Sequence, residues 1–167
     1  QIAKAETKDG SESAPLPFDL TSLQQYCANR WGYTADQVLK AAQGLYETHK
    51  ATSYPRTDSR YLPVSQFDEV PDVMQALIRT DDAISGLVAG ADTSMRGRAF
   101  NDAKVSAHHA IIPTTQVVDM AKMSEVERNV YDAVRRHWIA QFYSAFTFDK
   151  TVIEVTCGKH TLEARGK

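Results

Sequence analysis

The segment SYPRTDSR, residues 53–60, combines side chains that can act together on a phosphodiester. Pro55 disfavours the helical conformation for Tyr54 and directs it toward extended geometry, in which residues i and i+2 share a face. Tyr54 and Arg56 then point the same way, and Asp58 continues that face. An arginine beside a phenol lowers the cost of ionising it, which is roughly 4 kcal/mol for a free tyrosine at pH 7. Because the same guanidinium can grip a phosphate, the pair suits a tyrosine nucleophile.

A second group of chemically capable residues lies in KVSAHHAIIPT, residues 104–114. His108 and His109 precede an apolar pair and Pro113, so the segment is expected to be extended or loop-like. A histidine near neutrality can donate to a phosphate oxygen or relay a proton. A metal site is less favoured, because adjacent histidines in an extended segment point in opposite directions and no third ligand lies at a suitable spacing.

Both segments also have a purely structural interpretation. Tyr-x-Arg arises by chance, TDS is a common turn or cap sequence, and a histidine is often only a solvated or capped side chain. The net charge of −2 gives no global attraction to nucleic acid, so such a function must depend on a local patch. Arg96, Arg98 and Lys104 against Asp102 form one locally positive stretch, although charged clusters are usually only solvated surface.

The composition limits the classes of protein to which the chain can belong. The 167 residues fit one domain, or one domain with fragments of a neighbour, and 43% apolar residues suffice for a packed core. We expect no membrane segment, because no apolar run approaches about 18 residues. Cys27 and Cys157 lie far apart in no metal-ligand spacing, so both are expected to be reduced thiols. The first residue is Gln1 and the sequence stops in mid-pattern, which predicts a piece of a longer protein.

Two helices separated by a glycine are predicted near the N-terminus. Thr21 or Ser22 can cap the first, which ends at Gly32, and Thr34 can cap the second, TADQVLKAAQGLYETH. This is the outline of a DNA-reading helix-turn-helix, and equally of an ordinary helical hairpin.

The rest of the chain is predicted to contain two more helices and a C-terminal hairpin. One helix runs from Gln66 to about Arg79, and another, with a capping box of Ser124 and Glu127, runs to about Ala145. Its apolar stripe comprises Val130, Val134, Trp138, Phe142 and either Tyr131 or Ala145. The period-two segment FDKTVIEVTC, a turn at Gly158 and HTLEARG predict two strands. The fold class expected is mainly α, with short β segments at the C-terminal edge.

Taken together, these segments resemble the type IA DNA topoisomerases, most closely the bacterial topoisomerase III branch. The resemblance rests on LTSLQQYCANRWGYTADQVLKAAQGLYE, then ATSYPRTDSRYLP, then AFNDAKVSAHHAIIPT, in the family's order. It extends from about Leu16 through FDKTVIEV. Each motif alone is weak, whereas both site motifs in order after the helix pair form a specific combination.

The resemblance implies roles for individual residues. Tyr54 matches the catalytic tyrosine that forms a transient 5′-phosphotyrosine with a single DNA strand, and Arg56 matches the arginine at the scissile phosphate. His108, rather than His109, matches the assisting histidine because it follows the alanine of AH-x-AI. Asp58, Arg60 and Lys104 are candidates for weaker DNA contacts, and none of these residues is expected to bind a metal. Strand passage and religation would follow cleavage.

The resemblance also predicts a division of the chain. Residues 1–17 would be a linker or stub of the gate domain, 18–145 the helical catalytic-tyrosine domain, and 146–167 a partial β stub of the gate domain. The Mg²⁺ of the full enzyme would be bound by a separate N-terminal domain, since no Asp-x-Asp-x-Asp occurs here, and this fragment itself would hold no cofactor. We therefore expect the fragment alone to be inactive and monomeric. Its partners would be single-stranded DNA and the other domains of the polypeptide, in the bacterial cytoplasm near the nucleoid.

Other functions fit less well. A tyrosine recombinase needs His-x-x-Arg upstream of the tyrosine, and a rolling-circle nuclease needs two histidines separated by one apolar residue, whereas His108 and His109 are downstream and adjacent. A non-enzymatic helix-turn-helix DNA-binding module and a purely structural domain stay open. The former predicts preference for duplex DNA and indifference to Tyr54→Phe.

Overall fold

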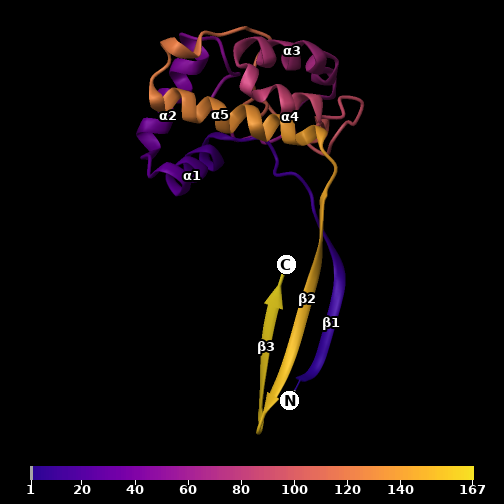
Figure 1. Ribbon diagram of the computed structural model, residues 1–167. Coiled ribbons are helices and arrows are strands. Elements are labelled where there is room, and N and C mark those ends of the chain that lie inside the picture. The colour runs from indigo at the N-terminus through magenta and orange to yellow at the C-terminus, as the bar shows by residue number, and fades with distance from the viewer. Residues whose placement is uncertain (1) are drawn as a thin grey trace. The chain divides into compact units, whose positions relative to one another are not determined.

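The structure is a computed structural model, and it describes residues 2–167 (Figure 1). The α-helices are α1 (Leu20–Trp31), α2 (Ala35–Glu47), α3 (Val70–Thr80), α4 (Ser85–Ala89) and α5 (Glu125–Ile139). The strands are β1 (Ile2–Glu12), β2 (Phe146–Cys157) and β3 (His160–Gly166). One-turn and two-turn 3₁₀ helices cover Val64–Glu69, Asp82–Ile84, Asp102–Lys104, Met120–Lys122 and Ala140–Phe142. No helix within this part of the chain is long and apolar enough to cross a bilayer.

The chain divides into two compact units. One is helical and comprises Pro15–Tyr143; the other contains the three strands and comprises the residues up to Ala14 together with Ser144–Lys167. The fold is therefore a mixture of helix and sheet rather than a mainly α chain with short β segments. The expected fold class is met in part: helices dominate Pro15–Tyr143, but the sheet has long strands.

The cap of the first helix differs from the prediction. Asp19, and neither Thr21 nor Ser22, is the N-cap of α1: its carboxylate accepts from the backbone N–H of Ser22 at 2.7 Å. A carboxylate before the first turn also complements the helix dipole. Gly32 ends α1 with φ of +72°, a conformation that costs glycine little, and Thr34 caps α2 as predicted.

The third helix begins later than the pattern predicts. Residues Val64–Glu69 form a 3₁₀ helix, and α3 begins at Val70 with Pro71 in its first turn. Proline fits the first turn because the N–H that it lacks has no intrahelical partner there. The segment 64–79 therefore contains a 3₁₀ helix followed by an α-helix, and not one continuous α-helix.

The core of the helical unit is built around α5, which packs against α1 and α2 (Figure 1). The capping box of Ser124 and Glu127 is present as predicted. The predicted stripe is buried, and Tyr131 rather than Ala145 completes it. The α-helix ends at Ile139, six residues earlier than expected, and a 3₁₀ turn carries Phe142 into the core.

A buried ion pair ties α5 to the end of α3. Arg135 is 4% exposed, and its guanidinium contacts Asp81 at 2.6 Å and Asp132 at 2.7 Å. Burial by itself would raise the pKa of Asp81, but hydrogen bonds from Arg135 and from the backbone N–H of Ala83 outweigh it and lower that pKa. The pair is therefore charged at neutral pH.

The strand unit is an antiparallel sheet in the order β1-β2-β3. β2 and β3 form the predicted hairpin, which turns at Gly158 with φ of +60°. β1 was not predicted as a strand, because residues 2–12 are polar and lack clear alternation. Ten of its residues pair with β2, so the strand is specified by its partner more than by its own pattern.

Candidate active site

The segment that carries Tyr54 bends at Ser53 and Pro55 and exposes alternate residues. Tyr54, Arg56 and Asp58 are exposed, whereas Pro55 and Thr57 are buried. The phenol, the guanidinium and the carboxylate are therefore all open to solvent.

Ser53 joins this segment to the one that follows the histidines. Its backbone N–H donates to the carbonyl of Ile112 at 2.9 Å, and its hydroxyl donates to the carbonyl of Ala110 at 3.0 Å. The same hydroxyl accepts from the N–H of Ile112 at 3.0 Å. Thr52 and Pro113 form an antiparallel bridge beside these bonds. The two motifs, about fifty residues apart in sequence, are thus held together by main-chain pairing.

Further pairings fix the downstream part of the same segment. The N–H of Ala110 donates to the carbonyl of Tyr61 at 2.9 Å, and the N–H of Ile111 donates to the carbonyl of Phe18 at 2.8 Å. Leu62 forms a parallel bridge with Phe100. Because these partners are main-chain groups at buried or half-buried residues, the loop that presents Tyr54 has a defined path although it belongs to no regular element.

The two histidines have different roles in the structure. His109 accepts from the side-chain amide of Gln66 at 2.9 Å through Nε2, and its Nδ1 donates to the carbonyl of Ala110 at 2.8 Å. Both ring nitrogens of His109 are therefore committed to the fold. His108 is exposed, and its ring centroid lies 4.9 Å from that of Tyr54. The structure places His108, and not His109, beside the phenol.

A second tyrosine, which the sequence analysis did not single out, contacts the first. Tyr46, in the last turn of α2, lies edge-to-face on Tyr54 with ring centroids 5.5 Å apart. The ammonium of Lys50 lies 6.0 Å from the centre of the Tyr46 ring. No signal in the sequence marks this position, because Tyr46 follows Val38 by eight residues and so continues the helical period of the buried face.

The other predicted DNA-contacting residues already have partners within the chain. Arg60 donates to the carbonyl oxygens of Pro17 at 2.9 Å and Leu16 at 3.0 Å, so it holds the segment that leads into α1. Lys104 is exposed, with its ammonium 3.2 Å from the hydroxyl of Tyr61 and 4.7 Å from the centre of that ring. Arg60 is thus placed in the scaffold, whereas Lys104 stays accessible to solvent.

The remaining polar groups at the site are available to a ligand. Within residues 2–167, the side chains of Tyr54, Arg56, Asp58 and His108 make no hydrogen bond or ion pair with the protein. In the same part of the chain, no three His, Cys, Asp or Glu side chains lie close enough to hold a metal ion.

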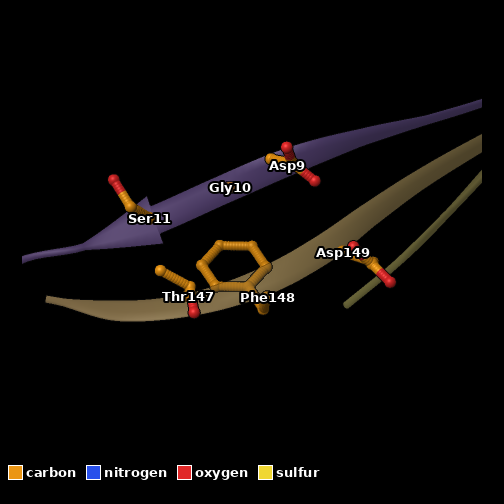
Figure 2. Close-up of a pocket in the computed structure, with 6 residues that line it drawn as sticks. All are labelled: Asp9, Gly10, Ser11, Thr147, Phe148 and Asp149. Carbon is orange, nitrogen blue, oxygen red and sulfur yellow. The ribbon is translucent and has the colours of Figure 1, made fainter.

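A separate hollow lies in the strand unit and contains none of these residues (Figure 2). Its volume is about 550 Å³, and it is lined by Asp9, Gly10, Ser11, Thr147, Phe148 and Asp149. The ring of Phe148 lies against β1 at Gly10, where a Cβ would come within 2.6 Å of the ring. Gly10 therefore permits the ring to lie flat on the sheet.

Comparison with known proteins identifies the family. The family model for DNA topoisomerase matches residues 1–167. The chain belongs to the DNA topoisomerase family. It is 42% identical over 167 residues to DNA topoisomerase 3 of Salmonella typhimurium, covering 99% of this chain and 25% of that protein. It is 37% identical over 166 residues to DNA topoisomerase 3 of Vibrio cholerae, covering 99% of this chain and 26% of that protein. The resemblance inferred from the sequence is thereby confirmed.

A solved topoisomerase shares the fold. The full-length topoisomerase I of Thermotoga maritima matches with a TM-score of 0.66 and 19% identity over 98% of this chain and 27% of its own. The chain spans about a quarter of the length of the curated relatives that it matches. Other parts of a topoisomerase polypeptide therefore lie outside the region described here.

Proposed function

We propose that this chain carries the nucleophile of a type IA DNA topoisomerase and that Tyr54 attacks one strand of DNA. The observation that carries the proposal is the contact between the exposed rings of Tyr54 and His108, with the exposed Arg56 two residues from Tyr54. Membership of the DNA topoisomerase family supports DNA as the substrate.

In the proposed reaction the phenolic oxygen of Tyr54 displaces the 3′-oxygen at phosphorus. The O–P bond to Tyr54 forms, the P–O3′ bond breaks, the phenolic proton is lost and the leaving 3′-oxygen gains a proton. Religation is the reverse, with the free 3′-hydroxyl attacking the phosphotyrosine. No net bond energy is lost in the cycle, so relaxation needs no nucleotide hydrolysis.

The neighbouring side chains have distinct tasks in this proposal. Arg56, which is unpaired within the described chain, binds the non-bridging phosphate oxygens and stabilises the charge that grows on them. His108 lies close enough to Tyr54 to donate to a phosphate oxygen or to the leaving oxygen. Asp58 and Lys104 are exposed and can contact the flanking strand, whereas Arg60 acts through the scaffold.

The proposal assigns the Mg²⁺ of the full enzyme to another domain of the polypeptide. In this proposal the residues of the present chain contact the DNA and leave the metal to that domain. We further propose that this chain alone neither cleaves nor relaxes DNA efficiently, and that it is monomeric. Mg²⁺-dependent relaxation of supercoiled plasmid by the purified chain would contradict the first of these points.

The alternative of a helix-turn-helix module that reads duplex DNA has weaker support. The helix that would enter the groove, α2, carries Asp36, Lys40 and Glu47, which are two carboxylates against one ammonium. The ammonium of Lys40 is already 2.7 Å from Asp36. Such a surface repels phosphates rather than attracting them.

A covalent-adduct assay tests the proposal. The chain is mixed with labelled single-stranded oligonucleotide, Mg²⁺ and a separately made N-terminal metal-binding domain of the same enzyme type, and then denatured. We expect an adduct with wild type and none with Tyr54→Phe, which keeps the ring contacts and removes only the nucleophilic oxygen. An adduct that persists in Tyr54→Phe would place the nucleophile elsewhere.

Variants of the two histidines provide a matched comparison. His108→Gln is expected to reduce the rate of adduct formation by roughly 10²-fold without lowering the unfolding midpoint, because its ring is exposed and unpaired. His109→Gln is expected to lower the unfolding midpoint and to leave the rate of adduct formation nearly unchanged, since both of its ring nitrogens are bonded within the fold. Equal loss of rate in both variants, at unchanged stability, would argue against the assignment.

A further inference from the structure

We propose that Tyr46 is a stacking platform for a nucleobase of the bound single strand, directly beside the nucleophile. This inference rests on the proposed function of Tyr54 as far as the identity of the ligand is concerned. It adds a binding subsite formed by Tyr46 and Lys50.

The first support is the exposure of the ring. Tyr46 is 37% exposed and Tyr54 is 38% exposed, and they contact each other edge-to-face. Large aromatic side chains that lie together on the surface usually mark a binding site. The hydroxyl of Tyr46 makes no hydrogen bond within the described chain, so burial of a polar tip does not explain why the residue is a tyrosine.

The second support is that Tyr46 belongs to a group of neighbouring aromatic rings. The ring centroid of Tyr54 lies 5.5 Å from that of Tyr46 and 4.9 Å from that of His108. A phosphate at the hydroxyl of Tyr54 brings the attached nucleoside within reach of a neighbouring ring. Aromatic rings beside a backbone-binding cation are the usual means of holding single-stranded nucleic acid without reading its sequence.

The third support is the position of Lys50. It has φ of +55°, a left-handed conformation that glycine adopts without cost and that few other residues adopt. Its ammonium lies 6.0 Å from the centre of the Tyr46 ring, and its carbonyl is held by the hydroxyl of Thr114 at 2.6 Å. The chain therefore keeps a cation at the turn that leads from α2 to Tyr54, where it can pair with a phosphate next to the stacked base.

The test separates base contact from backbone contact. The affinity of the chain for a fluorescein-labelled dT₁₂ is compared with its affinity for a twelve-unit strand of abasic sugar-phosphate, by anisotropy at low salt. We expect wild type to bind dT₁₂ about tenfold more tightly than the abasic strand. Tyr46→Leu should lose about tenfold for dT₁₂ and nothing for the abasic strand, and Tyr46→Phe should bind both as wild type does.

Lys50→Gln serves as the complementary variant. It should weaken binding of both strands by the same factor and reduce the salt dependence of binding, because it removes a phosphate contact and no base contact. Equal loss by Tyr46→Leu for both strands, no loss for either, or no binding of dT₁₂ by wild type would each overturn the proposal. Because only binding is measured, intact base discrimination without any adduct at Tyr54 would refute the proposed function and leave the platform standing.

Discussion

Ser53→Ala tests whether the two site motifs are held together as described. The change removes one hydroxyl that donates to the carbonyl of Ala110 and accepts from the N–H of Ile112. Ala110 is fully buried and Ile112 is 9% exposed, so neither group gains full hydration in return. The carbonyl of Ala110 keeps the bond from His109, so the N–H of Ile112 suffers the larger loss.

The expected magnitude follows from these two bonds. A net hydrogen bond contributes about 1 kcal/mol, and an unpaired buried donor costs about 1–3 kcal/mol. We therefore expect Ser53→Ala to lower the free energy of unfolding by about 2 kcal/mol, a substantial part of the 5–15 kcal/mol typical of a domain. Ser53→Thr should lose less than about 0.5 kcal/mol, because it keeps the hydroxyl and favours extended backbone.

Tryptophan fluorescence in urea is a suitable assay. Trp31 and Trp138 are the two tryptophans of the sequence, and both belong to the helical unit, so the signal follows that unit. With an m-value of about 2 kcal/mol per molar, the midpoint of Ser53→Ala should fall by about 1 M. A shift below about 0.25 M, or an equal shift in Ser53→Thr, would refute the reasoning that the hydroxyl joins the two motifs.

Three further predictions concern the scaffold. Arg135→Met should lower the free energy of unfolding by roughly 1–3 kcal/mol at pH 7. Because the pKa of Asp81 is lowered by folding, the ion pair stabilises the protein above that residue's ordinary pKa of 3.8 and loses its effect as pH falls through the folded value. The difference between wild type and Arg135→Met in denaturant titrations should therefore shrink below about pH 4, and a constant difference would contradict the assignment. Cys157 is exposed, whereas burial raises the pKa of the Cys27 thiol to about 12. A thiol reagent at pH 8 should therefore label Cys157 quickly and Cys27 only after unfolding. Mass spectrometry of the digested protein would show which thiol is labelled. Gly32→Ala should lower the free energy of unfolding by about 1 kcal/mol, as measured by thermal unfolding, because residue 32 has φ of +72°. A Cβ would meet no other atom there, so the backbone conformation alone causes the loss. An unchanged stability would mean that the turn changes conformation.

Much of the site could be predicted from the sequence because its information is local. Pro55 disfavours helical geometry for Tyr54, and this local effect predicts that Tyr54 and Arg56 both lie on an irregular, accessible segment. The exposure of both residues agrees with that prediction. Helix caps at Thr34 and Ser124 and the hairpin at Gly158 are equally local, since each depends on a few neighbouring residues.

The rest depended on contacts between distant residues. The polar segment 2–12 forms a strand because its backbone pairs with that of β2. The helix α5 ends at Ile139, where the chain turns and buries Phe142. The spacing of the two histidines says nothing about which one is free; the side chain of Gln66 decides that by occupying His109.

The sequence by itself therefore determined the family and the segment that carries Tyr54. Only the tertiary structure decided that Ser53 joins this segment to the histidine segment, and that Tyr46 and His108 both contact Tyr54. The physical reason is that a backbone conformation is set by adjacent residues, whereas the distance between two segments is set by the hydrogen bonds and packing of the whole chain.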